Sequence, residues 1–350
     1  MTIVLQNHEI PGLMPLSGYI SAVEDGYRDV GTRQGTNFPR ENLWIPGDRD
    51  EAHGGGHLKE GTKGSVKFKA AALPEIGGAG VQAYTAGLPG GLDTYMFLFD
   101  TDDGSLAAIT EVLYYDWIKT AATAAIATDH LAPEDSSVVG LFGTGRHART
   151  QLHGLCAVRP VERVQAYSRR REPREEFCEQ MSDELGIDVV PADSPSAALK
   201  GVDIVTTITT SSEPVFDGAE LPDRSIHINA MGAHYPWVRE IDEDVVQRSR
   251  IVLDEWEQGL QEQGAILIPM EEGRLDASDL HGDLGDVVAG NVAGREPETE
   301  RTLFLSGGTG VEDVAVATRL YEHAKNEGVG TEIFFNQPYD FDLDGLYDQC

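Results

Sequence analysis

The sequence contains little cysteine. Its three cysteines, Cys156, Cys178 and Cys350, include no CxxC pair. An odd number of cysteines without metal-type spacing argues against a disulfide framework and a structural zinc site, and favours a reducing compartment. No apolar run approaches the roughly 18 residues that a membrane span requires, and the first residues lack the pattern of a signal peptide. We therefore expect a cytoplasmic protein with no membrane partner.

Basic residues are also scarce. Lys and Arg number 27 against 59 Asp and Glu, and the formal net charge is −32. A surface of this sign repels phosphate backbones and anionic lipids, so we expect no nucleic-acid partner. The acids are spread along the chain, and 40% of the residues are hydrophobic, which favours folded cores over disorder. This composition is typical of halophilic organisms, where a Debye length of about 3 Å in molar salt screens the repulsion.

The 350 residues are enough for two domains. The first 60 or so are rich in Gly, Pro and charge, and predict loops around one or two short strands. Strand-like runs at 65–73, 80–86 and 93–100 have short connections and predict an antiparallel sheet. An Ala-rich helix is expected at about 112–131.

The pattern changes at Pro133. From there, β-type runs such as SSVVGLF, VERVQAYS and DIVTTIT alternate with helical runs. This alternation is typical of βαβ units in a parallel sheet that helices cover on both faces. We therefore predict an α/β chain with a central Rossmann-type, doubly wound domain. A last helix at about 312–326 should pack back on the first domain.

A glycine loop follows the strand SSVVGLF directly and opens the helix ARTQLHGL. The first Gly permits a tight turn, the second lets the backbone approach a pyrophosphate, and the third position must be small for helix and strand to pack. The N–H groups of the helix start can then bind phosphates. The pattern predicts a dinucleotide site, with a purely structural turn as the alternative. The loop consists of Gly143, Thr144, Gly145, Arg146, His147 and Ala148.

The next strand ends in Ser168-Arg169-Arg170-Arg171. An acidic residue at this point binds the ribose hydroxyls in NAD-selective sites, and it would repel a 2′-phosphate. Ser and Arg can instead hydrogen-bond the phosphate and balance its charge. We therefore predict NADP(H) as the cofactor, held by Ser168, Arg169 and Arg170. A solvated helix start is the alternative.

Several stretches together resemble the ornithine cyclodeaminase/μ-crystallin family over nearly the full length of the chain: LFGTGRHARTQL, GVDIVTTIT, HINAMGAHYPWVREID, LFLSGGTGVEDVAV and FLFDTDDGSLAAI. The resemblance implies hydride transfer between NAD(P) and a small imino or amino acid. It also implies a homodimer. Residues 131–314 would form the Rossmann domain. Residues 1–130 and 315–350 would form an α+β substrate-binding and dimerisation domain, built from the N-terminal segment and the C-terminal helix.

The resemblance places further residues beside the cofactor. Thr207 and Thr209 would lie where a strand of the parallel sheet ends. The segments that approach the nicotinamide half would contribute His227, Asn229, Ala230, Met231, Gly232, Ser306 and Gly307.

The substrate site departs from the family pattern at three positions. Gln82 stands where the family has a Lys, and an amide neither carries charge nor moves a proton at neutral pH. Lys119 replaces an Arg that clamps the substrate carboxylate, which keeps the charge but loses the bidentate fork. His234 replaces the acidic residue of the cyclodeaminases, and it can still act as an acid or base. Arg40 and Arg49 are candidates for an early-chain Arg of the family.

Two lysines precede Gln82. Lys67 and Lys69 are two residues apart, so their side chains share one face of a strand. If that strand pairs with the strand of Gln82, Lys69 could place its ammonium where the missing one belonged. An exposed salt-bridging pair is the alternative. We expect no metal site, because the glycines between His53 and His57 disfavour the helix that their spacing would need.

We favour an NADP-dependent oxidoreductase of the ketimine reductase or amino-acid dehydrogenase type. In it, Lys119 holds the substrate carboxylate and Lys69 or His234 handles protons. A catalytically silent NADPH-binding protein is one alternative. Ornithine cyclodeaminase proper is another, less favoured because ammonia loss relies on the Lys and the acid that are replaced here.

Overall fold

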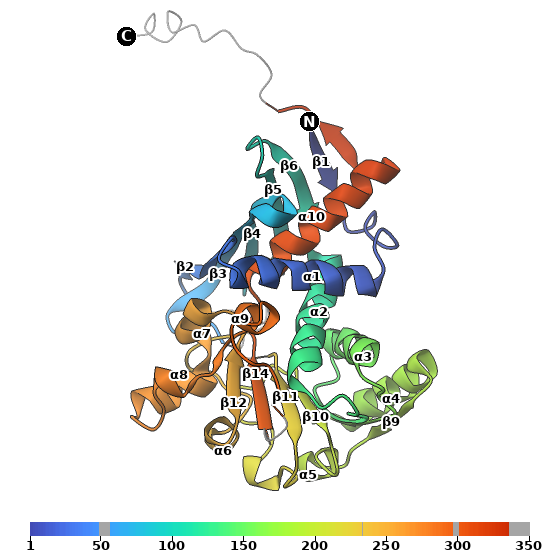
Figure 1. Cartoon of the computed structure of the whole chain (residues 1–350), viewed down its shortest axis with the longest axis vertical. Coiled ribbons are helices and arrows are strands. Elements are labelled where there is room, and N and C mark those ends of the chain that lie inside the picture. Colours follow the sequence, from blue (N-terminus) through green and yellow to red (C-terminus); the bar gives the residue numbers. More distant parts are fainter. Residues whose placement is uncertain (49–56, 233, 297–300, 336–350) are drawn as a thin grey trace, which may run out of the picture.

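The structure is a computed structural model that describes residues 1–48, 57–232, 234–296 and 301–335. These residues form two sheets linked by the long helix α2 (Leu113–Leu131), as Figure 1 shows. The strands of the first sheet are β1 (Thr2–Leu5), β2 (Thr36–Pro46), β3 (Thr62–Leu73), β4 (Gly78–Ala86), β5 (Thr94–Asp100), β6 (Leu106–Glu111) and β15 (Thr331–Ile333). Helices α1 (Leu16–Gly31) and α10 (Gly310–Glu327) lie against this sheet.

The first sheet has the order β15-β1-β6-β5-β4-β3-β2. Strands β3 to β6 are paired antiparallel, which confirms the expected antiparallel sheet. Side chains alternate between its two faces, so Met96 and Leu98 of β5 enter a core with α1 and α10. The predicted C-terminal helix is confirmed as α10, and it packs on α1, β3 and β4 as expected.

The first 60 residues contain two strands, β1 and β2, as expected. The expectation that loops and short strands make up this segment is otherwise wrong, because it contains the 16-residue helix α1 and β2 has 11 residues. Helix α1 begins after Pro15 without a side-chain cap, and its glycines lower its helix propensity. What stabilises it is packing. Tyr19, Ala22, Val23 and Tyr27 have helical spacing and are buried on one stripe.

The second sheet is parallel throughout its pairs. Its strands are β7 (Val138–Phe142), β8 (Arg163–Tyr167), β9 (Asp188–Pro191), β10 (Ile204–Thr207), β11 (Ile226–Ala230), β12 (Arg250–Leu253), β13 (Gly282–Asp283) and β14 (Arg301–Leu305). Its helices are α3 (Arg146–Val158), α4 (Arg171–Leu185), α5 (Pro195–Ala198), α6 (Glu243–Gln247), α7 (Trp256–Glu262), α8 (Gly264–Glu271) and α9 (Leu284–Val288).

The strand order β13-β12-β14-β11-β10-β7-β8-β9 confirms the doubly wound fold. One apolar core lies between this sheet and α3 and α4, and another lies on the side of α6 and α8. The chain runs outward from β7 through β8 to β9, then returns to β10 on the other side of β7. Ligands of such sheets bind outside the carboxyl ends of the strands at this switch point. The strand order therefore predicts a ligand-binding site at the loops after β7 and β10.

Candidate active site

Two adjoining cavities lie at the carboxyl end of the parallel sheet. The first measures about 560 Å³ and is bounded by the loops that follow β7, β8 and β10. The second measures about 770 Å³ and is lined by residues from both sheets. Gly145, Ile208, Thr209 and Thr210 belong to both walls, so the cavities join. Their arrangement suits an elongated ligand with one end against the first sheet.

The glycine loop has the geometry that its sequence predicts. Gly143 has a φ of +105°, and a side chain there would meet the Ile208 carbonyl oxygen at 2.4 Å. Gly145 precedes the first turn of α3, and a Cβ atom built on it meets nothing within 4 Å. The space in front of it is therefore open for a group as large as a phosphate, next to the free N–H groups of a helix start. Ala148 is buried in the core beneath.

Arg146 and His147 point into the second cavity from the start of α3. Arg146 lies over the Trp117 ring at 5.5 Å, and His147 meets the edge of the same ring at 6.4 Å. Burial lowers the pKa of His147, although the Asp116 carboxylate opposes this. Trp117 thus supports the glycine loop from α2.

The end of β8 lines the first cavity with Ser168, Arg169 and Arg170. The Thr144 hydroxyl donates to the Ser168 hydroxyl at 2.9 Å, which ties this end to the glycine loop. The third arginine of the run, Arg171, instead forms an ion pair with Glu175 at 2.7 Å on α4. Two of the three arginines are therefore available at the cavity.

Two buried carboxylates position the loops of the second cavity. Glu240 accepts hydrogen bonds from the Thr207 hydroxyl, from the Thr209 N–H and hydroxyl, and from the Gly232 N–H. Asp254 accepts from the Ser306 hydroxyl and from the N–H groups of residues 307 and 308, at 2.8–3.0 Å. Burial raises the pKa of Asp254 to about 7. Thr209, Met231, Gly232, Ser306 and Gly307 line the cavity, while Thr207 is buried behind it.

The resemblance implies that His227 and Asn229 lie beside the cofactor, but the structure places their side chains elsewhere. Both are fully buried in β11. The His227 ring lies 2.9 Å from the Thr302 hydroxyl and 3.0 Å from the Asn229 side-chain oxygen, and Asn229 donates to the Thr128 hydroxyl on α2. Burial lowers the pKa of His227 to about 3, so the ring is neutral. These side chains join the sheet to α2, and Ala230 lies buried beside them.

The strand parity predicted for the two lysines is confirmed. Lys67 and Lys69 both line the second cavity from β3, and Lys69 lies directly opposite Gln82 on β4. The Gln82 amide nitrogen donates to the Thr94 hydroxyl at 3.0 Å, and its side-chain oxygen is buried without a partner among the described residues. Lys69 therefore faces Gln82 across the two paired strands.

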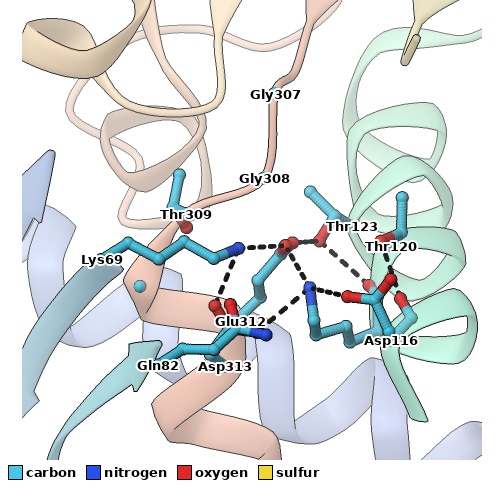
Figure 2. A network of polar contacts seen from close by, with 12 residues as sticks. Lys69, Gln82, Asp116, Thr120, Thr123, Gly307, Gly308, Thr309, Glu312 and Asp313 are labelled. Atoms are coloured by element: carbon cyan, nitrogen blue, oxygen red, sulfur yellow. Dashed lines mark hydrogen bonds and ion pairs between the residues drawn. The ribbon is translucent and has the colours of Figure 1, made fainter. Parts of the chain in front are cut away.

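Lys69 belongs to a cluster of five charges, drawn in Figure 2, in which all but Asp116 are buried. Its Nζ atom lies 2.8 Å from Asp313 and 3.9 Å from Glu312, two acids in the first turn of α10. Lys119 Nζ lies 3.0 Å from Glu312, and 3.1 Å from both Asp313 and Asp116. Burial alone would lower the pKa of Lys119, but these carboxylates raise it well above its usual value.

Arg40 is the early-chain arginine that reaches the site; Arg49 lies outside the described residues. Arg40 forms an ion pair with Glu262 at 2.8 Å and donates to the carbonyl oxygens of Gly307 and Gly308 at 2.5 and 2.7 Å. Its Nε atom is buried with no partner among the described residues.

His234 lines the same cavity, with its ring 4.6 Å from that of Tyr235. Burial, together with the charges of Arg40 and Lys67, holds the pKa of His234 well below its usual value. The ring is therefore neutral and a weak base.

Sequence reasoning missed most of the acids of the site. They are Asp116, Glu240, Asp254, Glu262, Glu312 and Asp313. Acids inside apolar segments, as in GVEDVAV and RIVLDE, were the available sign that these carboxylates are buried and paired.

Within the described ranges, no group of three or more His, Cys, Asp or Glu side chains could hold a metal ion. His53 lies outside those ranges, while His57 contacts the Thr210 carbonyl oxygen at 3.0 Å. No helix in the described part of the chain is long and apolar enough to cross a membrane.

The chain was compared with protein families and with known proteins. Residues 76–328 match the model of the Ornithine cyclodeaminase/mu-crystallin family. A Delta(1)-pyrroline-2-carboxylate reductase of Bacillus cereus is 34% identical over 241 residues, which are 69% of this chain and 74% of the relative.

Solved structures of similar proteins superpose on the chain over nearly its full length. The Delta(1)-pyrroline-2-carboxylate reductase of Thermococcus litoralis, in complex with NADH and L-proline, superposes with a TM-score of 0.84 at 30% identity, and the match covers 95% of this chain and all of the other. An archaeal alanine dehydrogenase dimer with bound NAD superposes with a TM-score of 0.85 at 29% identity, covering 96% and 99%.

Proposed function

The chain belongs to the ornithine cyclodeaminase/mu-crystallin family, and from that premise we propose that it is a nicotinamide-dinucleotide-dependent oxidoreductase that reduces a small imino acid to an amino acid. The observation that carries the proposal is the junction of the two cavities at Gly145, a glycine loop on one side and a wall of ionisable groups on the other. When bound, the nicotinamide supplies the hydride that the imine carbon receives.

The glycine loop fits the dinucleotide because Gly145 leaves room for its pyrophosphate at the start of α3. Met231, Gly232, Ser306 and Gly307 would flank its nicotinamide half, held in place by Glu240 and Asp254. The charged wall supplied by β3, α2 and α10 would orient the substrate against it.

Among imino acids, we propose a cyclic one, in which the C=N bond already exists. Making an imine from an oxo acid and ammonia, or expelling ammonia from ornithine, needs several proton transfers. Gln82 cannot transfer protons, and the lowered pKa of His234 makes its ring a weak base. Two named relatives, from Bacillus cereus and Thermococcus litoralis, are reductases of a cyclic imino acid.

The test is NADPH and NADH oxidation, followed at 340 nm, with Δ1-pyrroline-2-carboxylate, its six-membered homologue, and pyruvate with ammonia. Halophilic origin stays a prediction from the charge of −32, so the assay is run with and without molar KCl. We expect turnover with the cyclic imines first. NADPH binding without turnover on any of these would instead support the silent binding protein, and proline formation from ornithine would support a cyclodeaminase.

We further propose that NADP(H) is preferred, because Arg169 and Arg170 line the first cavity and no acidic residue is among the described residues of its wall. Arg169→Ala should weaken NADPH binding roughly 10-fold or more, since a charged hydrogen bond to the 2′-phosphate is lost, and leave NADH binding unchanged. Arg171→Ala is the matched control, because Arg171 is paired with Glu175. Fluorescence titration of both coenzymes measures this. Equal losses for NADPH and NADH in Arg169→Ala would contradict the preference.

A homodimer is proposed through the outer face of the first sheet. Apolar side chains of β2, β4 and β5 are exposed there by 37–50%: Phe38, Val81, Tyr95, Phe97 and Phe99. A contiguous apolar face of this kind is typical of an interface. It belongs to the substrate-binding and dimerisation domain that we propose for residues 1–130 and 315–350, beside the Rossmann domain at 131–314. Light scattering should give twice the mass of 38.0 kDa, and a monomer would refute the proposal.

A further inference from the structure

The charged wall of the second cavity has an uneven distribution of charge. The cluster of Lys69, Lys119, Asp116, Glu312 and Asp313 contains two cations and three anions. The Lys119 ammonium has three N–H groups, and three carboxylates lie within 3.1 Å of it. A substrate carboxylate placed there would meet a surplus of negative charge. Lys119 is therefore poorly placed for the carboxylate-holding role that the resemblance assigns to it.

Arg40 is also engaged. Its charge is balanced by Glu262, and both terminal nitrogens donate to protein acceptors. Its unpartnered Nε atom is one donor that a ligand could still use.

Lys67 differs from these cations. Its side chain is buried with 1% of the residue exposed, and it lines the cavity. Its Nζ atom donates to the Tyr235 hydroxyl at 2.6 Å and lies 4.4 Å from the centre of the Tyr235 ring and 5.8 Å from that of Tyr84. Among the described residues, no carboxylate lies within ion-pair distance of it. Two of its three N–H groups are therefore free for a ligand.

We propose that Lys67 binds the carboxylate of the substrate, between the rings of Tyr84 and Tyr235. The negative cluster around Lys119 then lies on the side suited to a cationic ring nitrogen, so the wall matches an imino acid with one carboxylate and a protonated C=N group. This assignment rests on the proposed function for the identity of the substrate. Its direct test is nevertheless a binding measurement that needs no turnover.

The pKa of Lys67 provides a second measurable quantity, the number of protons taken up when a ligand binds. Burial, together with the charges of Arg40 and Lys69, lowers the pKa of Lys67 to about 7 against the opposing effect of Glu262. A bound carboxylate favours the charged ammonium and must raise this pKa. Binding at pH 8 should therefore take up close to one proton, and binding at pH 6 almost none. The charged or titratable groups near it are Arg40, His57, Lys69, Tyr84, His234, Tyr235 and Glu262.

The experiment is isothermal titration calorimetry of the full chain, with pyrrole-2-carboxylate and pyrrole-2-carboxamide as probes of identical ring shape. The unmodified protein should prefer the carboxylate. Lys67→Met should reduce that preference roughly 10- to 100-fold, as expected for a lost charged hydrogen bond, and Lys67→Arg should retain part of it. Lys63→Met, the same substitution at an exposed position of β3, is the matched control and should change nothing.

Proton uptake is read from the dependence of the binding enthalpy on buffer at pH 8, and it should vanish in Lys67→Met. The assignment is overturned if the unmodified protein shows no carboxylate preference, or if Lys67→Met keeps both the preference and the proton uptake. NADPH binding by the same variant checks that it is folded. Carboxylate binding that depends on Lys67, together with no reduction of any imine, would refute the proposed reaction and leave this site standing.

Discussion

Replacing Gly145 with Val is expected to weaken NADPH binding about 100-fold, or ~2.7 kcal/mol, while the cofactor-free protein still folds. A Cβ atom at this position meets no protein atom within 4 Å, so the added side chain occupies the space that we assign to the pyrophosphate. The loss of glycine before α3 costs at most about 1 kcal/mol of stability. The variant therefore separates binding from folding.

Fluorescence titration gives the affinity, and thermal unfolding without cofactor gives the stability. Gly90→Val is the matched control, because it adds the same side chain to open space in the turn between β4 and β5. Gly143→Val should behave differently from both. Its Cβ would lie 2.4 Å from the Ile208 carbonyl oxygen at a φ of +105°, so folding itself should suffer. Unchanged NADPH affinity in Gly145→Val would exclude the glycine loop as the cofactor site.

The parallel half of the fold was predictable from the sequence because its signals are local. Strands β7 and β8 are followed closely by the helices α3 and α4. Gly143 has a positive φ, which glycine adopts readily. Helix α1 was not predictable in this way. Its glycines and missing cap argue against a helix, and its stability comes from burial of Tyr19, Val23 and Tyr27 against distant parts of the chain.

The site shows the same contrast between features that local sequence predicts and features that depend on distant contacts. Strand parity places Lys67 and Lys69 on one face, and pairing with β4 then brings Lys69 opposite Gln82. Nothing local distinguishes the two lysines. They differ because α10 directs two carboxylates at Lys69, while Lys67 meets aromatic rings from β4 and from the loop after β11. That distinction depends on contacts between segments more than 150 residues apart, as the separation of 168 between Lys67 and Tyr235 illustrates.

The different partners of Lys69 and Lys67 predict a large difference in stability between variants at these two positions. Lys69→Met should destabilise the fold by about 3–5 kcal/mol, because it leaves the buried carboxylates of Asp313 and Glu312 with less neutralising charge. Lys67→Met is the matched comparison. It makes the same substitution two residues away on the same face, at 1% exposure against 3%, but removes a cation with no carboxylate partner among the described residues. Its stability should change by no more than about 1 kcal/mol.

The pH dependence of the difference identifies its cause. Lys119 and Lys69 both lower the pKa of Glu312 in the folded protein, so removing Lys69 raises that pKa relative to the folded unmodified protein. The folded variant then binds more protons than the folded unmodified protein, so lowering the pH favours folding of the variant relative to the unmodified protein. Urea unfolding should accordingly show the full deficit at pH 7.5 and a smaller one at pH 5. A deficit that is independent of pH, or equal in both lysine variants, would mean that lost packing rather than unpaired charge is responsible.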